Sequence, residues 1–205
     1  MNTNKKTARR DLIVQAAATV FAEKGFSSTL MADIARSADI GKGTIYEYFR
    51  SKDDLFLAVF DYFVQKINQA GVNVTTLGLG SAADRLNALS RSIAAWIIEH
   101  HDIYTLSLEF WAASVTGSEE MRARLKGAFR DNYRKFRDLC AAIIEDGIRR
   151  GEFRNDIEPA AVASAIVGSW DGLGLQSWFE DDFDIEKTIS HYTDMLLRGL
   201  FAPPI

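Results

Sequence analysis

Helical periodicity is the feature that most constrains this chain. Apolar residues recur at every third or fourth position in nearly every segment, as at Leu12, Ala16 and Val20. This spacing places them on one side of an α-helix. No segment shows the alternation of apolar and polar residues that indicates a half-buried strand. The sequence therefore predicts an all-α protein.

Glycines and capping residues divide this pattern into individual helices. The predicted helices are 6–24, a short one capped by Ser28 or Thr29, 43–49, one that begins at Ser51, 81–101, 103–115, 118–151, 156–179 and 184–201, with a loop over 72–80. We expect Ser81, Asp156 and Asp184 to cap the helices that begin with them. The helix starting after Asp156 has the length of a membrane span, but its apolar content is mostly alanine and glycine. We expect it to be a buried or interface helix, in a protein with no membrane association.

Cysteine usage and the amino terminus bear on the cellular location. The chain has one cysteine, Cys140, which cannot form an intrachain disulfide, and the first residues lack the apolar run of a signal peptide. We expect a cytoplasmic protein. Cys140 lies on the apolar stripe of a long predicted helix, which indicates a buried, inert thiol instead of a redox sensor.

Charge is distributed unevenly along the chain. The net charge is −4, but the first 52 residues carry nine Lys or Arg and five Asp or Glu, and so +4, which leaves −8 for the remainder. A basic amino-terminal quarter on an acidic body is typical of a DNA-binding head, because local phosphate contacts set the affinity. Solvated basic ends are also common, so the asymmetry alone does not decide the function.

Two short predicted helices joined by a tight turn, before a capped long helix, form a candidate helix-turn-helix. In the second of them Ile45 and Phe49 point the same way on a helical wheel and must face the core. Glu47 points in the opposite direction, Gly43 and Thr44 lie on the outer side, and Tyr46 and Tyr48 lie on the two flanks. A helix in the major groove has a phosphate strand on each side and base edges beneath it.

These side chains suit phosphate binding. The hydroxyls of Tyr46, Tyr48 and Thr44 can donate to phosphate oxygens, and Lys42 stands at a helix start, where the dipole also favours an anion. Lys52 and Thr29, at the starts of the neighbouring helices, repeat that arrangement. Each tyrosine could instead cover an edge of the core. Glu47 could read a cytosine amino group or reach back to Lys42 or Arg50, and both options remain open.

Residues 6–60 resemble the DNA-binding domain of the TetR family of bacterial transcriptional regulators. The resemblance rests on the pattern formed by Gly43, Thr44, Tyr46, Tyr48, Phe49, Ser51, Lys52 and Leu55. It implies a helix-turn-helix DNA-binding domain over 1–52 and a larger helical ligand-binding and dimerisation domain over 53–205. It also implies a homodimer that binds a palindromic double-stranded DNA operator, contacted by Thr29, Lys42, Thr44, Tyr46, Tyr48 and Lys52, and that represses until a small molecule binds.

The two last predicted helices carry stripes that suit dimerisation. Ala160, Ser164, Gly168 and Gly172 recur at every fourth position and let another helix approach closely. The last helix has an apolar stripe that begins with Ile185 and Ile189. Either stripe could be satisfied within one subunit, but two recognition helices one DNA turn apart require a dimer.

Aromatic residues of the body indicate what ligand to expect. In the family the middle helices enclose the ligand cavity, so the resemblance implies a small apolar or aromatic ligand. The candidate lining residues are Trp96, Tyr104, Phe110, Trp111, Tyr133, Phe136 and Trp170. Such a stripe is also typical of an ordinary core, so each of these residues remains a candidate only.

Other functions receive less support from the sequence. His100, His101, Asp102 and Glu109 suggest a metal site, but adjacent histidines on a helix point about 100° apart and cannot readily share an ion. A helical enzyme using Glu109 with one of these histidines would lack a nucleotide loop or a nucleophile motif, and no cofactor is indicated. A DNA-binding adaptor switched by a protein partner remains the main alternative to a ligand-responsive repressor.

Overall fold

The computed structural model describes the backbone of residues 3–69 and 80–202, and the side chains of residues 5–66, 80–100 and 105–202. Across those residues it contains nine helices and no strand beyond an isolated bridge between Phe153 and Phe201. The all-α prediction is confirmed. None of the described helices is both long enough and apolar enough to span a membrane. The predicted loop over 72–80 lies outside the described residues, except for Gly80.

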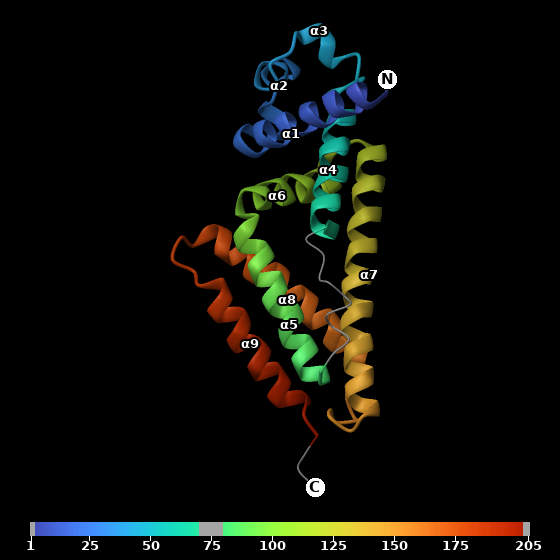
Figure 1. The fold of residues 1–205 in the computed structure, drawn as a ribbon, viewed down its shortest axis with the longest axis vertical. Helices are drawn as coiled ribbons and strands as arrows, with labels where there is room; N and C mark the ends of the chain where they lie inside the picture. The colour runs from blue at the N-terminus through green and yellow to red at the C-terminus, as the bar shows by residue number, and fades with distance from the viewer. Residues whose placement is uncertain (1–2, 70–79, 203–205) are drawn as a thin grey trace. The chain divides into compact units, whose positions relative to one another are not determined.

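The helices follow one another along the chain as shown in Figure 1. They are α1 (Thr3–Ser28), α2 (Met31–Ser37), α3 (Lys42–Ile45), α4 (Lys52–Gln69), α5 (Ala82–Glu99), α6 (His101–Thr116), α7 (Glu119–Arg149), α8 (Pro159–Phe179) and α9 (Ile185–Leu200). Their packing divides the described residues into two units. The first unit lies within 1–70 and 102–126, and the second within 71–101 and 127–205. The boundary expected between residues 52 and 53 stays a prediction.

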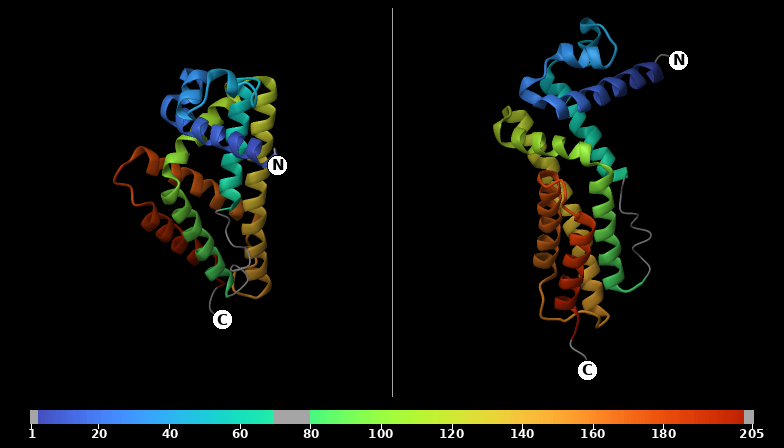
Figure 2. Two further views of the ribbon diagram at one scale, coloured as in Figure 1. Left: turned by 45° about the horizontal axis from the view of Figure 1, so that its top comes forward. Right: turned by 90° about the vertical axis from the view of Figure 1, so that its left-hand side faces the viewer.

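The first unit contains α1 to α4, α6 and the first turns of α7, and α1 contacts both α2 and α4 (Figure 2). Aromatic rings form the centre of its core. The Phe56 ring lies 4.4 Å from Phe26 and 4.9 Å from Phe110, and Phe110 lies 4.9 Å from Phe60 and 5.3 Å from Phe63. This ring cluster joins α6 to α1 and α4.

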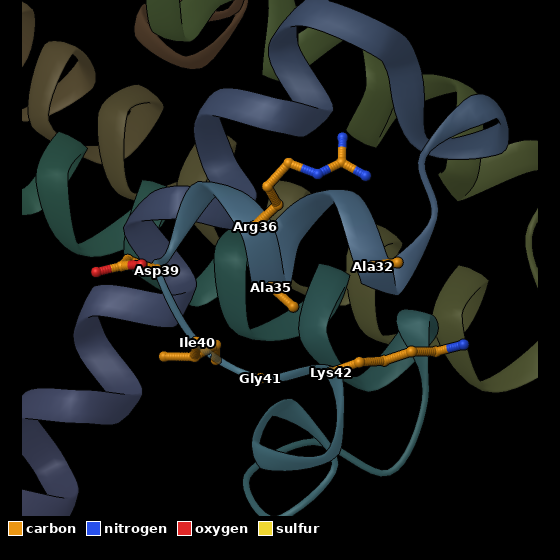
Figure 3. A pocket seen from close by; sticks show the side chains of 7 residues that line it. All are labelled: Ala32, Ala35, Arg36, Asp39, Ile40, Gly41 and Lys42. Atoms are coloured by element: carbon orange, nitrogen blue, oxygen red, sulfur yellow. The ribbon is translucent and has the colours of Figure 1, made fainter.

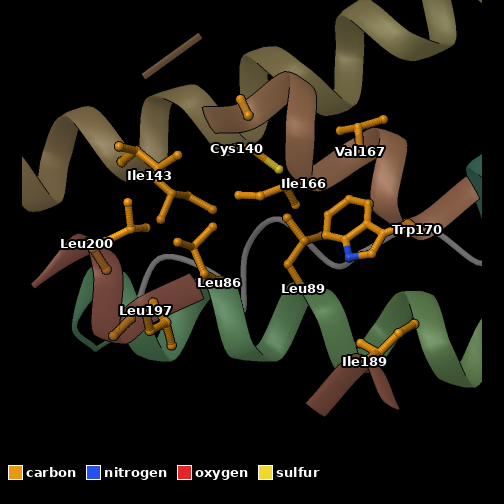
Figure 4. Packing of buried hydrophobic residues seen from close by; sticks show 14 of the residues in the cluster. Leu86, Leu89, Cys140, Ile143, Ile166, Val167, Trp170, Ile189, Leu197 and Leu200 are labelled. Atoms are coloured by element: carbon orange, nitrogen blue, oxygen red, sulfur yellow. The ribbon is translucent and has the colours of Figure 1, made fainter. Parts of the chain in front are cut away.

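The second unit is made of α5, α8, α9 and the rest of α7, with α5 running beside α9. Its core is mainly aliphatic (Figure 4) and is formed by buried residues that include Leu86, Leu89, Cys140, Ile143, Ile166, Val167, Trp170, Ile189, Leu197 and Leu200. Gly147 permits a close approach here, because a Cβ atom at this position would lie 2.8 Å from the Cβ of Ala82.

Local capping explains where most helices of the second unit begin. The Ser81 and Asp184 side chains accept from the N–H groups of Asp84 and Lys187, at 3.0 and 2.9 Å, as the sequence predicted. The cap predicted for α8 is wrong. Glu158 accepts from the first N–H groups of α8, and Asp156 instead pairs with Arg154 at 2.5 Å.

Candidate nucleic-acid interface

The segment expected to read DNA is helical over a shorter length than predicted. The α-helix α3 ends at Ile45 instead of at residue 49. Beyond it the N–H groups of Tyr46, Glu47 and Tyr48 donate to carbonyls three residues earlier, at 3.2, 3.1 and 3.2 Å. Bonds of this spacing form a tighter turn than an α-helix does. We call residues 42–49 the recognition segment.

Burial within the recognition segment agrees with the helical wheel. Ile45 and Phe49 are buried, at 0% and 1% exposure, whereas Glu47 is exposed and Tyr46 is 49% exposed. Lys42 and Gly43 are also exposed, and Thr44 and Tyr48 are half-buried. The two tyrosine flanks are therefore unequal, with Tyr46 the more accessible. The direction of the core is confirmed, and the DNA contacts themselves stay predictions.

A concave surface lies between α2 and the start of α3 (Figure 3). The pocket has a volume of about 440 Å³, and its lining residues are Ala32, Ala35, Arg36, Asp39, Ile40, Gly41 and Lys42. The backbone turns at Asp39, which has a φ of 51°, a conformation that aspartate tolerates better than most residues. Arg36 and Lys42 give this surface a positive border.

Sequence reasoning missed two basic residues of the first unit. The Arg36 side chain is 79% exposed and lies 3.6 Å from Asp33, one turn earlier. The Arg10 guanidinium lies over the Phe49 ring, 5.0 Å from its centroid. Arg36 could have been found by extending the helical wheel to α2, because Ile34 and Ala35 already define its buried side. The Arg10 contact spans 39 residues and has no local signal.

Thr29 does not cap α2 as the sequence predicted. The N-cap residue is Leu30, whose N–H donates to the Asp33 carboxylate at 3.3 Å. This hydrogen bond, with Lys24 nearby, holds the pKa of Asp33 below its usual value. Thr29 is 0% exposed, and its hydroxyl donates to the Gly25 carbonyl at 2.7 Å. That side chain is therefore occupied inside the protein.

Lys52 also has partners within the protein. Its ammonium donates to the carbonyl oxygens of Phe26, Ser27 and Thr29, at 2.7, 3.2 and 3.0 Å. The ammonium has three N–H donors, one for each of these carbonyl oxygens. The carbonyls lie at or just beyond the C-terminal end of α1. The same ammonium lies 4.5 Å from the centroid of the Phe26 ring. A phosphate would have to compete with these contacts for the Lys52 ammonium. The three carbonyls are at least 23 residues away from Lys52 in the sequence.

The Glu47 carboxylate is exposed to solvent. Within the part of the chain whose side chains are described, it forms no ion pair with Lys42 or Arg50. It borders a hollow of about 620 Å³ beside the start of α4 and the first turn of α7, which also contains Arg50. The contact of Glu47 with Lys42 or Arg50, which the sequence left open, is therefore not formed in this structure.

The candidate ligand residues divide between the two units. Phe110 and Trp111 belong to the first, where Phe110 is 0% exposed inside the ring cluster. Trp96, Tyr133, Phe136 and Trp170 belong to the second, and the Tyr104 side chain lies outside the described residues. The pocket that they were expected to line stays a prediction.

Polar groups of the second unit bear on that pocket. The indole N–H groups of Trp96 and Trp170 are buried and have no acceptor among the described residues. Tyr133 hydrogen-bonds the side chain of Asp171, and burial raises the pKa of Asp171 above its usual value despite this bond. Unpaired buried donors are rare in native proteins, so both indoles are available to an acceptor atom.

Of the groups weighed for metal chemistry, Glu109 and His100 have other partners, and the side chains of His101 and Asp102 lie outside the described residues. Glu109 accepts from the Phe26 N–H at 3.0 Å, and the His100 ring stacks on Trp96 with centroids 5.0 Å apart. Among the described residues, no cluster of three potential ligands could hold a metal ion. Cys140 is 0% exposed, and burial raises its pKa to about 12, which leaves it unreactive.

Comparisons with known proteins agree with this arrangement. Residues 13–59 match the family of bacterial regulatory proteins called tetR, and residues 82–200 match the C-terminal domain of BetI-type transcriptional repressors. The transcriptional repressor KstR2 of Rhodococcus jostii is 28% identical and aligns over 98% of this chain and 96% of its own. The uncharacterized regulator YhgD of Bacillus subtilis is 38% identical, over 95% and 97% of the two chains.

A solved structure shows the same fold. The regulator FadR of Bacillus subtilis, determined in complex with stearoyl-CoA, superimposes with a TM-score of 0.71 at 21% identity, covering 92% of this chain and 97% of its own. The relatives are transcriptional regulators, which decides against the helical enzyme. The match to family models over both parts of the chain, with the helix-turn-helix geometry of α2 and α3, shows that this protein belongs to the TetR family of DNA-binding transcriptional regulators.

Proposed function

We propose that the protein is a homodimeric repressor that binds a palindromic operator and is released from it by a small apolar or aromatic ligand. The observation that carries the DNA-binding part is the burial pattern of the recognition segment. Ile45 and Phe49 fix it to the core, and Tyr46 and Glu47 are left exposed. The cytoplasmic location expected from the sequence is part of this proposal, because operator DNA lies there.

The proposed DNA contacts follow from exposure and chemistry. Lys42, Thr44, Tyr46 and Tyr48 bind phosphates, and Glu47 reads a base edge. Gly43 allows close approach because, among the described residues beyond its own helix, no atom lies within 4 Å of its Cβ position. Arg36 joins this set from α2. Thr29 and Lys52 are left out of the proposed phosphate contacts, because both side chains bind backbone carbonyls within the protein. We assign them the role of stabilising the segment before α2.

The two candidate dimer stripes differ in exposure. In the predicted stripe of α9, Ile185, Ile189 and Leu200 are buried within the subunit, and Tyr192 and Leu196 are half-buried. By contrast Ala160, Ser164, Gly168 and Gly172 of α8 are all exposed, and no described atom of another element lies within 4 Å of the Cβ positions of the two glycines. We therefore assign the first close helix contact of the dimer to α8, with the exposed side of α9 beside it.

The ligand is proposed from the second unit. Trp96, Tyr133, Phe136 and Trp170 supply aromatic surface, and the two unpaired indole N–H groups favour a ligand that carries an acceptor oxygen. The printed title of the FadR structure names stearoyl-CoA, a ligand with a long apolar chain and carbonyl oxygens. An apolar or aromatic ligand with an acceptor group suits the same kind of surface.

Selection of duplexes from a random pool tests the DNA-binding proposal. The wild type is expected to enrich a palindrome, and sedimentation should give about twice the chain mass of 22.9 kDa. Replacing Arg36 or Lys42 by alanine should lower the slope of log affinity against log salt by about one unit in each half-site. A monomer at micromolar concentration, or an unchanged slope, would contradict the corresponding part of the proposal.

Glu47→Ala separates base reading from a passive surface role. Because phosphates repel the carboxylate, its removal should strengthen binding to random DNA. It should also relax the preference at one position of each half-site, worth about 1–3 kcal/mol. Identical preferences for the variant and the wild type would rule out base reading by Glu47.

Ligand release has a reciprocal test. A compound that quenches tryptophan fluorescence and lowers operator affinity must itself bind more weakly, by the same factor, when operator is present. A compound that quenches without changing operator affinity does not occupy the regulatory site. If only a protein extract releases the operator, the adaptor function replaces the ligand-responsive one.

A further inference from the structure

The connection between α1 and α2 is held by two side chains from distant parts of the sequence. α1 is interrupted at Gly25, which has a φ of 75°. Just after this break, the Phe26 N–H donates to Glu109 Oε2 on α6 at 3.0 Å, and the Phe26 carbonyl accepts from Lys52 Nζ on α4 at 2.7 Å. We call residues 25–29, with Glu109 and Lys52, the backbone clamp.

The backbone clamp is closely packed. A Cβ atom at Gly25 would lie 3.0 Å from Glu109 Oε1, so the carboxylate rests directly against the break. The Phe26 ring lies 4.4 Å from the Phe56 ring and under the Lys52 ammonium. A charged acceptor and a charged donor therefore hold the same residue from two helices. Such charge-assisted bonds are stronger than neutral ones.

The position of this segment determines where the DNA-reading helices lie. Thr29 is separated from α2 by Leu30 alone, and four residues separate α2 from α3. A shift of residues 25–29 therefore displaces the start of α2, because a single residue lies between them. We propose that Glu109 is a positioning residue for DNA binding: through Phe26, it holds α2 and the recognition segment in the arrangement that fits the operator. This inference rests on the proposed DNA contacts.

The sign of the effect distinguishes this role from general electrostatics. Glu109 is an acidic residue in the unit that binds a polyanion, so removing its charge should strengthen DNA binding if charge alone mattered. A positioning role makes the opposite prediction. Glu23, an exposed acid on α1, supplies the matched control for the loss of one negative charge.

The experiment measures the affinity of Glu109→Ala, Glu109→Gln and Glu23→Gln dimers for the duplex that the wild type enriches. Glu109→Ala should bind about tenfold more weakly or worse, the effect of losing a hydrogen bond to a charged group, with an unchanged salt slope. Glu109→Gln keeps an acceptor oxygen and should be intermediate. Glu23→Gln should bind as tightly as the wild type or more tightly.

Two further measurements separate positioning from a loss of folding. Stoichiometric titration gives the fraction of each variant that binds, and urea unfolding gives its stability. Hydrogen exchange should be faster at the Phe26 amide in Glu109→Ala than in the wild type, even where the global stability is unchanged. If Glu109→Ala does not fold, Glu109→Gln carries the same comparison.

Lys52 tests whether both side chains act on one element. Lys52→Ala should weaken operator binding without lowering the salt slope. Combined with Glu109→Ala it should do less than the two single effects predict, because both act through Phe26. The Arg36→Ala effect should instead add to that of Glu109→Ala.

The outcomes distinguish this inference from the proposed function. If the wild type enriches no duplex, the proposed function fails. If it does, but Glu109→Ala binds as tightly as the wild type or more tightly, or the Phe26 amide exchanges at the wild-type rate, the positioning role is wrong. A salt slope lowered by Lys52→Ala would return Lys52 to the phosphate contacts.

Discussion

The two units of this protein are stabilised in different ways. In the first, large rings fill the space between α1, α4 and α6, and side chains from distant helices bind the backbone at the break in α1. In the second, aliphatic and small residues let helices approach closely, and the distant Glu152 carboxylate accepts from the first N–H groups of α5 at 2.7 and 2.9 Å. Both units therefore use long-range contacts of single side chains, and they differ in their cores, which consist of packed rings in the first and of aliphatic side chains with close helix approach in the second.

The largest expected effect tests the ring cluster. Phe110→Ala removes a ring that is 0% exposed and contacts three others. It should lower the free energy of unfolding by about 3–5 kcal/mol. Urea unfolding at fixed protein concentration measures the change. Phe110→Leu, which keeps most of the volume, should cost less, and equal losses would contradict the role of packing.

A smaller effect tests close approach in the second unit. Gly147→Ala places a methyl group against Phe153 and 2.8 Å from the Cβ of Ala82. Overpacking of this kind should destabilise the protein by about 1–3 kcal/mol. Gly127→Ala is the control on the same helix, because the one described contact within 4 Å of its Cβ position is the flexible end of Arg130 at 3.9 Å. The control should be neutral or stabilising, since alanine favours helix over glycine.

The smallest expected effect concerns pH. Burial raises the pKa of Asp171 in the folded protein, so the charged form destabilises the fold at neutral pH. Asp171→Asn should then be more stable than the wild type at pH 7. The difference should shrink as the pH falls through the folded pKa and the wild type takes up its proton. A difference in unfolding free energy that does not vary with pH would contradict this.

The sequence predicted features that depend on residues close together in the chain, and it did not predict contacts between residues that are far apart. The spacing of Ile45 and Phe49 fixed the orientation of the recognition segment, and Ser81 and Asp184 cap helices that begin one residue later. The partners of Lys52 and Glu109 lie far away in the sequence, so no spacing rule could find them. From the sequence, Lys52 at the start of a helix was expected to bind a phosphate, but in the structure three backbone carbonyls accept from its ammonium.

The exposed small-residue face of α8 has a consequence for how tightly it can bind another helix. Alanine and glycine have no side-chain rotamers to lose, and serine has few, so covering this face costs little side-chain conformational entropy. A face of lysine or glutamate would lose far more freedom for the same buried area. Close packing of a second helix at Gly168 and Gly172, as proposed for the dimer, would thus keep more of the free energy gained by contact.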